Sequence, residues 1–262
     1  MVGNEDVRRG VLEPDPALDG FQVSATDRCW WCGDVATTEE HRIKASTLRR
    51  VGRAEDGTTE PSNVFKKSSD YEGALRTLKK GAQVRWRKNM CADCNNSRSQ
   101  PFDRAYDVFE AFLVSRFDAI VGWTHLDWQD VYGDEWQVGA RNLARYFAKQ
   151  LGCMLATYDL PVPDDVRRFL DGGDRCSSVS FMLVINPRVV ALMRPEGVGE
   201  DMSNFVGLLE APAYSSGDSF TGIDYGYHIG YLNFLAHWRE GEEFSSWFEH
   251  KTCKLPRFAA EQ

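Results

Sequence analysis

"CADCNNSRSQ", residues 91–100, is the stretch of this chain that decides its fold. Cys91 and Cys94 are separated by two residues, and Asn95 follows the second cysteine directly. Arg98 lies three residues further on, just before a segment whose apolar residues recur at helical spacing. A thiol pair with an amide and a base beside it predicts a metal-binding turn that leads into a helix.

A second pair with the same spacing, "CWWC", lies much earlier in the chain. Two such pairs supply four thiolates, which are enough to close a tetrahedral structural zinc site. A redox C-x-x-C motif would normally lie in a βαβ context, and neither pair has one. We therefore predict that structural Zn²⁺ is held by Cys29, Cys32, Cys91 and Cys94.

The three other cysteines are isolated in the sequence, and we expect them to be small buried apolar residues. They are Cys153, Cys176 and Cys253.

The composition is that of a soluble globular protein. The chain has 262 residues, 42% of them hydrophobic and 27% charged, which suits one large domain or two modest ones. Its longest apolar runs, such as "FMLVI" at 181–185, are too short to span a bilayer. The N-terminus lacks the basic-then-apolar pattern of a secretory signal, so we expect a cytoplasmic location with reduced thiols and no membrane partner.

The charge is unevenly distributed along the chain. Residues 42–104 contain 15 Lys and Arg against 7 Asp and Glu, a formal charge of +8. Since the whole chain carries −8, the remainder must carry −16. A local basic stretch attracts a polyanion whatever the net charge is, so this segment predicts DNA as a partner.

Between the two cysteine pairs, "VATTEEHRI" at 35–43 has the β-branched residues of a strand. Near its end stand Glu40 and His41, the latter one of only five histidines. Hydrolysis of a phosphodiester needs a base that deprotonates water near neutral pH, a task that suits a neutral imidazole. It also needs a hard cation to compensate charge on the phosphate and the leaving oxygen.

Together, Cys-x-x-Cys, Glu-His-Arg-Ile and Cys-x-x-Cys-Asn-x-x-Arg resemble the HNH endonuclease family, the ββα-metal nucleases, in its four-cysteine zinc form. The resemblance covers about residues 28–104. It implies that His41 is the general base, and that Glu40 and Asn95 hold catalytic Mg²⁺ or Mn²⁺, which prefer oxygen ligands. Arg98 matches the basic position of the family and would face the phosphate.

Two features depart from that pattern. Adjacent strand residues point to opposite faces, so Glu40 and His41 share a site only where the strand ends or is distorted. The family also carries a middle asparagine that ties the loop between its strands, and Trp86 stands there. Either Asn89 or another group such as Asn63 would have to take that role.

The predicted fold class is α+β: a zinc-stabilised ββα-metal (HNH) module followed by an α+β domain. Apolar spacing predicts a helix from Pro101 onward, with Ala105, Tyr106, Phe109, Phe112 and Leu113 as its core face. Further predicted helices span 134–152 and 163–171. Predicted strands lie at 178–186, 188–194, 204–211 and 225–235, and residues 47–81 form a long insertion, with a short helix at 70–80, that contacts DNA or a partner. The domain prediction is a tail at 1–27, the nuclease module at 28–118 and a second domain at 119–262.

Residues 119–262 contain no motif that indicates a particular chemistry. His125, His228, His237 and His250 follow no ligand spacing, and we expect structural or surface roles for them. This acidic half is expected to position the nuclease, to form a homo-oligomer or to recognise another protein.

The leading hypothesis is a metal-dependent DNA endonuclease with an HNH site, in the context of bacterial or phage defence or of a mobile element. The alternative is a non-catalytic zinc module that binds nucleic acid or a protein. A third hypothesis is an interaction protein whose function resides in residues 119–262.

Overall fold

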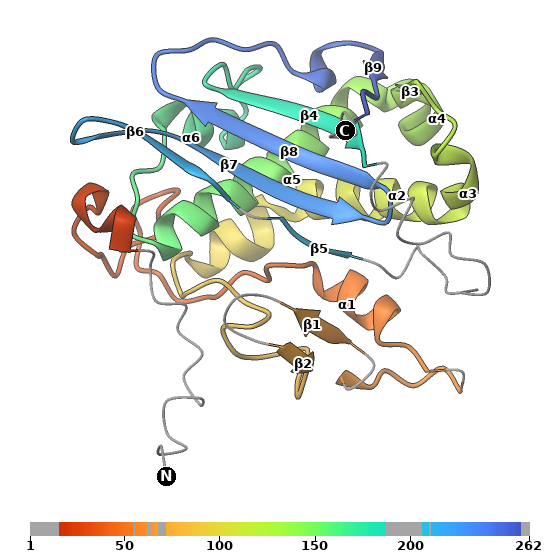
Figure 1. Ribbon diagram of the computed structural model, residues 1–262, viewed down its shortest axis with the longest axis horizontal. Coiled ribbons are helices and arrows are strands. Elements are labelled where there is room, and N and C mark those ends of the chain that lie inside the picture. The colour runs from red at the N-terminus through yellow and green to blue at the C-terminus, as the bar shows by residue number, and fades with distance from the viewer. Residues whose placement is uncertain are drawn as a thin grey trace, which may run out of the picture. The chain divides into compact units, whose positions relative to one another are not determined.

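The computed structural model describes residues 16–54, 56–61, 64–67, 72–186, 206–209 and 211–257. Helices and antiparallel strands are both present, so the α+β prediction is confirmed (Figure 1). The chain forms two compact units: the first is Met1–Ala92 with Cys153–Pro161, and the second is Asp93–Gly152 with Val162–Gln262. Within the described ranges, no helix combines the length and the apolar character needed to cross a membrane.

The first unit has little regular structure. A 3-10 helix, η2 (Pro16–Phe21), is followed by α1 (Ala45–Val51) and by two short antiparallel strands, β1 (Phe65–Lys67) and β2 (Glu72–Ala74). A small core packs between these elements; it consists of Leu48, Val64, Leu75, Leu78 and Val84.

The insertion therefore folds differently from the prediction. The helix predicted at 70–80 is wrong, because strand β2 and a bent segment occupy its described residues. Leu75 and Leu78 have helical spacing, but they bury their side chains against Leu48 from non-helical backbone. Helix α1 lies in a segment whose loop-forming residues gave no helix prediction, and burial of Leu48 accounts for it.

The helices of the second unit begin just after the second cysteine pair. They are α2 (Gln100–Ser115), α3 (Phe117–Ile120), α4 (Trp128–Tyr132), the 3-10 turns η5 (Gly133–Glu135) and η7 (Trp247–Glu249), α5 (Trp136–Thr157, whose last residues count with the first unit) and α6 (Asp164–Leu170). The predicted helices from 101, at 134–152 and at 163–171 are thus present. The prediction placed α2 in the first domain, whereas its aromatic face packs in the second unit.

The sheet of this unit is antiparallel, in the order β4-β8-β7-β5, with β6 also paired to β7 (Figure 1). Its strands are β4 (Val179–Ile185), β5 (Val206–Leu208), β6 (Ala213–Ser216), β7 (Ser219–Ile229) and β8 (Leu232–Arg239); β3 (His125–Asp127) pairs separately with β9 (Thr252–Lys254). The predicted strand at 178–186 is present, 204–211 contains β5, and 188–194 lies outside the described residues. The single strand predicted at 225–235 is wrong, since Gly230 (φ 50°) turns the chain and splits it between β7 and β8.

Helices α2 and α5 cover one face of the sheet (Figure 1). The ring of Phe234 lies 5.3 Å from Phe109 and 4.5 Å from Phe147, centroid to centroid. The hydroxyls of Tyr106 and Tyr227 are hydrogen-bonded at 2.7 Å. The predicted face of α2 is therefore core at Ala105, Tyr106, Phe109 and Leu113, whereas Phe112 is only half-buried.

The three isolated cysteines are buried, as predicted, and all are free thiols. Burial raises the pKa of Cys253 to about 12. Burial, together with the charge of Asp165, also raises the pKa of Cys176. Both therefore remain protonated at neutral pH, which makes them poor nucleophiles and poor metal ligands.

One fully buried cation holds the start of α2. Lys149 of α5 is 0% exposed, and its Nζ donates to Asp103 Oδ1 at 3.1 Å and to Ser99 Oγ at 3.4 Å. Ser99 Oγ in turn donates to the carbonyl of Asn95 at 2.8 Å. A buried lysine is rarely tolerated without such partners, so this ion pair fixes the backbone around Asn95.

We predict that Asp103→Asn lowers the free energy of unfolding by about 3 kcal/mol, because it leaves the charge of Lys149 buried without its carboxylate. Lys149→Met should cost less, and the double variant should recover part of the loss. Urea unfolding measures all three, with Asp130→Asn, an exposed position of α4, as the matched control. Additive losses in the double variant would contradict a coupled pair.

Candidate metal centre

The four cysteines of the two C-x-x-C pairs come together. The Sγ atoms of Cys29, Cys32, Cys91 and Cys94 all lie within 4.8 Å of one another, and Cys32 Sγ is 3.6 Å from Cys91 Sγ. Zn–S bonds of about 2.3 Å in a tetrahedron require sulfur atoms about 3.8 Å apart. The donor set and its spacing fit zinc, so this group can hold a structural zinc ion.

The first pair is shaped by a tight turn. The amide of Cys29 donates to the carbonyl of Asp34 at 2.6 Å, and that of Gly33 donates back to the carbonyl of Cys29 at 2.9 Å. Gly33 has a φ of 84°, a conformation that a side chain would strain. The turn thereby folds Cys32 back beside Cys29.

Two antiparallel segments of the first unit carry the predicted acid–histidine pair. Thr38 forms an isolated β-bridge with Met90, and His41 forms one with Arg85. Between these two bridges the first segment, 38–41, advances three residues while the second segment, 85–90, advances five, so the pairing is distorted there. Glu40 lies in this distorted stretch, with its carbonyl bonded to the amide of Trp86 at 2.8 Å.

This distortion bears on the first departure noted in the sequence. Glu40 and His41 do not lie on a regular strand, and both are half-buried. The condition under which adjacent residues can serve one site is met. Their roles as cation ligand and base remain predictions.

Trp86, at the position of the family's middle asparagine, packs its side chain against an arginine. Its ring is 2% exposed and lies under the guanidinium of Arg42, 4.5 Å from its centroid. Arg42 Nε also donates to the carbonyl of Arg85 at 3.1 Å. A stacked Arg–Trp pair thus links the two segments where the family uses an amide.

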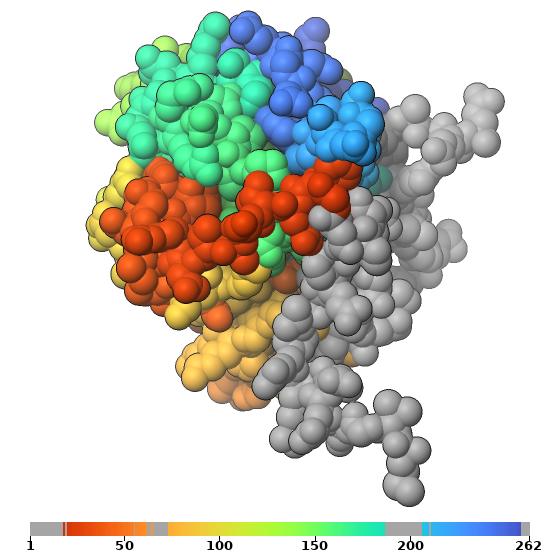
Figure 2. Space-filling view, turned by 90° about the vertical axis from the view of Figure 1, so that its left-hand side faces the viewer, coloured from red at the N-terminus to blue at the C-terminus, as the bar shows by residue number. Residues whose placement is uncertain are grey.

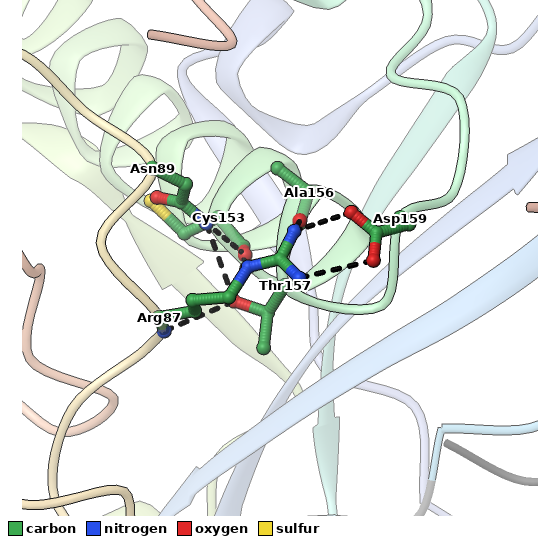
Figure 3. A network of polar contacts seen from close by, with 6 residues as sticks. All are labelled: Arg87, Asn89, Cys153, Ala156, Thr157 and Asp159. Carbon is green, nitrogen blue, oxygen red and sulfur yellow. Dashed lines mark hydrogen bonds and ion pairs between the residues drawn. The ribbon is translucent and has the colours of Figure 1, made fainter. Parts of the chain in front are cut away.

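Arg87 and Asn89, which lie in segment 85–90, form hydrogen bonds to the C-terminal end of α5 (Figure 3). Asn89 Nδ2 donates to the carbonyl of Cys153 at 2.9 Å and to Thr157 Oγ1 at 3.2 Å. The guanidinium of Arg87 forms a two-pronged ion pair with Asp159 and donates to the carbonyl of Ala156 at 2.7 Å.

The bond to Ala156 satisfies a carbonyl group that the last turn of α5 leaves without an intrahelical partner, whereas the carbonyl of Cys153 lies one turn earlier. Of the two residues considered for the role of the family's middle asparagine, Asn89 directs its side-chain amide to the end of α5, and Asn63 lies outside the described residues.

Asn95 and Arg98 lie on a π-helical turn, η4 (Asp93–Arg98), that also contains Cys94 of the second cysteine pair. Arg98 Nη1 donates to Cys94 Sγ at 3.3 Å, and its Nη2 pairs with Asp171. A cation that donates to a thiolate stabilises the ionised form required by zinc. Whether Arg98 also faces a phosphate remains a prediction.

The side-chain oxygen of Asn95 is an orphan among the described residues. Oδ1 is buried and has no hydrogen-bond partner there, although the backbone of Asn95 is held by Ser99. A buried acceptor without a donor costs about 1–3 kcal/mol. A bound cation would remove that cost.

The structure therefore gathers the four predicted zinc ligands, places Glu40 and His41 together on a distorted segment, and sets Asn95 beside a zinc-ligand candidate. Lys149 and Asp103, which fix the backbone of Asn95, were not found from the sequence; a lysine on the apolar face of α5 was the available indication. Comparison with protein families, curated proteins and solved structures finds no match to this chain.

We predict one tightly bound zinc per chain, and loss of it in Cys94→Ser. Structural zinc contributes about 10–16 kcal/mol in small folds, so the variant should also lose thermal stability. Elemental analysis of protein purified without chelator measures the metal. Cys253→Ser, at a buried cysteine outside the cluster, should keep its zinc; equal zinc loss in both variants would contradict the assignment.

Proposed function

We propose that this chain is a metal-dependent DNA endonuclease of the HNH type, with the four cysteines as its structural zinc site. The observation that carries the proposal is the buried, unpartnered Oδ1 of Asn95, one residue after Cys94. At that position the resemblance requires an oxygen ligand for a catalytic cation.

The cation site would combine one carboxylate with one amide oxygen. Glu40 would supply the first and Asn95 the second, a donor set that suits Mg²⁺ or Mn²⁺ with water completing the shell. Asn95 is preorganised, because the buried pair of Lys149 and Asp103 holds its backbone through Ser99. When bound, the cation would compensate charge on the scissile phosphate.

His41 would act on the attacking water. A neutral imidazole accepts the proton as the water oxygen attacks phosphorus, and the bond to the leaving 3′-oxygen breaks. The exposed lysines of the basic stretch, among them Lys79 and Lys80, would hold the DNA backbone.

A second candidate function is a zinc module that binds nucleic acid or protein without cleaving. The side-chain contacts of Arg98 favour it, since Cys94 and Asp171 engage the guanidinium that the nuclease hypothesis assigns to the phosphate. Trp86 in place of the family's asparagine favours it as well. Cleavage assays separate the two functions.

We predict that His41→Ala abolishes plasmid cleavage in Mg²⁺ or Mn²⁺ and leaves zinc content and DNA affinity unchanged. Loss of a general base costs about 10²–10⁴ in rate. Glu40→Ala and Asn95→Ala should instead be partly rescued by higher Mn²⁺, because they remove ligands of the cation. His125→Ala, at an exposed histidine of the second unit, is the control. Wild-type cleavage by His41→Ala would exclude this site and leave the binding module.

We predict that DNA binding depends on the basic stretch and weakens steeply with salt, because phosphate contacts release counterions. Lys79→Glu with Lys80→Glu should lower the affinity. The double variant should also reduce the slope of log affinity against log salt concentration by about two, one for each lost phosphate contact. Lys254→Glu, an exposed lysine of β9, should change neither. Fluorescence anisotropy of a labelled duplex over a salt series provides the measurement, and an equal loss for Lys254→Glu would mean that the surface is wrongly assigned.

A further inference from the structure

Four polar side chains converge on the sheet face that α2 and α5 leave open. Along β7 and β8, Tyr227 and Phe234 point toward the helices. Because strand residues alternate between faces, Asp224 and His237, which are cross-strand partners, lie on the other face. The strand β6, whose four residues are all exposed, borders this face, and its hairpin to β7 is visible at the surface in Figure 2.

A glycine makes room for the cluster. Gly222 of β7 is paired with Tyr214 on one side and with Arg239 on the other. With no side chain between them, the guanidinium of Arg239 reaches across β7 and lies 3.8 Å from the centroid of the Tyr214 ring. A Cβ at position 222 would stand 2.7 Å from Arg239 Cδ, so only glycine permits this arrangement.

Asp224 contacts each of the other three side chains of the cluster. Its Oδ1 lies 2.5 Å from His237 Nδ1 and 2.8 Å from Arg239 Nη1, and its Oδ2 accepts from the Tyr214 hydroxyl at 2.9 Å. Burial acts to raise the pKa of Asp224, but these hydrogen bonds outweigh it and lower the pKa below its ordinary value. The carboxylate is therefore ionised, and His237 must carry its proton on Nδ1.

The cluster keeps nitrogen atoms available for a ligand. Among the residues that the structure describes, His237 is hydrogen-bonded through Nδ1, with no bond to Nε2, and Arg239 contacts Asp224 and two backbone carbonyls through Nη1. The two side chains are 29% and 21% exposed, so solvent reaches them while the sheet holds them. On an ordinary polar sheet face, side chains of this kind extend into water rather than holding one another in place.

We propose that Asp224, His237, Arg239 and Tyr214 form a binding site for a phosphate group. Arg239 presents N–H donors that suit a tetrahedral oxyanion, and His237, in the form that carries a proton on both nitrogens, would donate from Nε2 while Asp224 balances its charge. The charges of Asp224 and Arg239 balance, so the net positive charge of the site is the one that a second proton on His237 would add. The site lies outside the proposed nuclease module and does not depend on its activity.

The test is an NMR titration of the full chain with inorganic phosphate, following the Cε1–H signal of His237. A saturable shift is expected, and in Arg239→Gln the affinity should fall about tenfold, the loss of one charge-assisted contact. Arg116→Gln, an exposed arginine stacked on Phe112 elsewhere in this unit, should bind as the wild type does.

A parallel titration with a nucleoside 5′-monophosphate identifies the source of the phosphate: tighter binding than that of inorganic phosphate indicates a nucleotide, and equal binding indicates the free anion. No saturable shift of His237 with tens of millimolar phosphate would overturn the proposal. So would an equal loss of affinity in Arg239→Gln and Arg116→Gln. The wild-type titration decides the first point even if Arg239→Gln fails to fold.

Discussion

The convergence of four thiol groups within 4.8 Å is the constraint on which the rest of the structure depends. Thiolates at that spacing repel one another unless a cation lies between them, and closing the loop from Cys32 to Cys91 costs conformational entropy. The first unit has few other sources of stability, since its core is small and β1 and β2 form only a two-stranded sheet. A zinc ion at the cysteines would supply the free energy that these elements lack.

The distorted pairing beside the cysteines has a structural cause. Two extra residues lie between Arg85 and Met90, relative to the segment they face. The bulged stretch directs Arg87 and Asn89 to the C-terminal end of α5, where they donate to the carbonyls of Ala156 and Cys153. Opposite this bulge, residues 39 and 40 belong to no regular strand, so the strict alternation that would separate the side chains of Glu40 and His41 does not apply. A packing requirement and the geometry that the proposed site needs are thus compatible in one segment.

The sequence predicted what depends on local spacing and missed what depends on pairing. The C-x-x-C pairs and the aromatic face of α2 follow fixed intervals, so four zinc ligands and a core helix were predictable. The register of the bulge was not, because the partners of Arg87 and Asn89 lie more than sixty residues away. The strand pair β7 and β8 was predicted as one strand, since its turn at Gly230 lacks the usual Asn-Gly or Asp-Gly.

His237 illustrates the same limit. It follows no ligand spacing along the chain and was expected to be a structural or surface residue. Its relation to Asp224 appears only once the hairpin is known, because the two residues are equidistant from the turn at Gly230 and Tyr231. A hairpin brings such positions face to face, so polar residues placed symmetrically about a turn are the indication that sequence reasoning could have used.

The acidic character of the second half of the chain does not weigh against an anion site there. Screening limits the reach of exposed charges to about 8–10 Å at physiological salt, so distant carboxylates contribute little at His237 and Arg239. What counts is the local balance, in which Asp224 offsets Arg239 and a second proton on His237 would add a positive charge. The same argument applies to the basic stretch of a chain whose net charge is −8. In both places the position of fixed donors, rather than the total charge, determines which anion can bind.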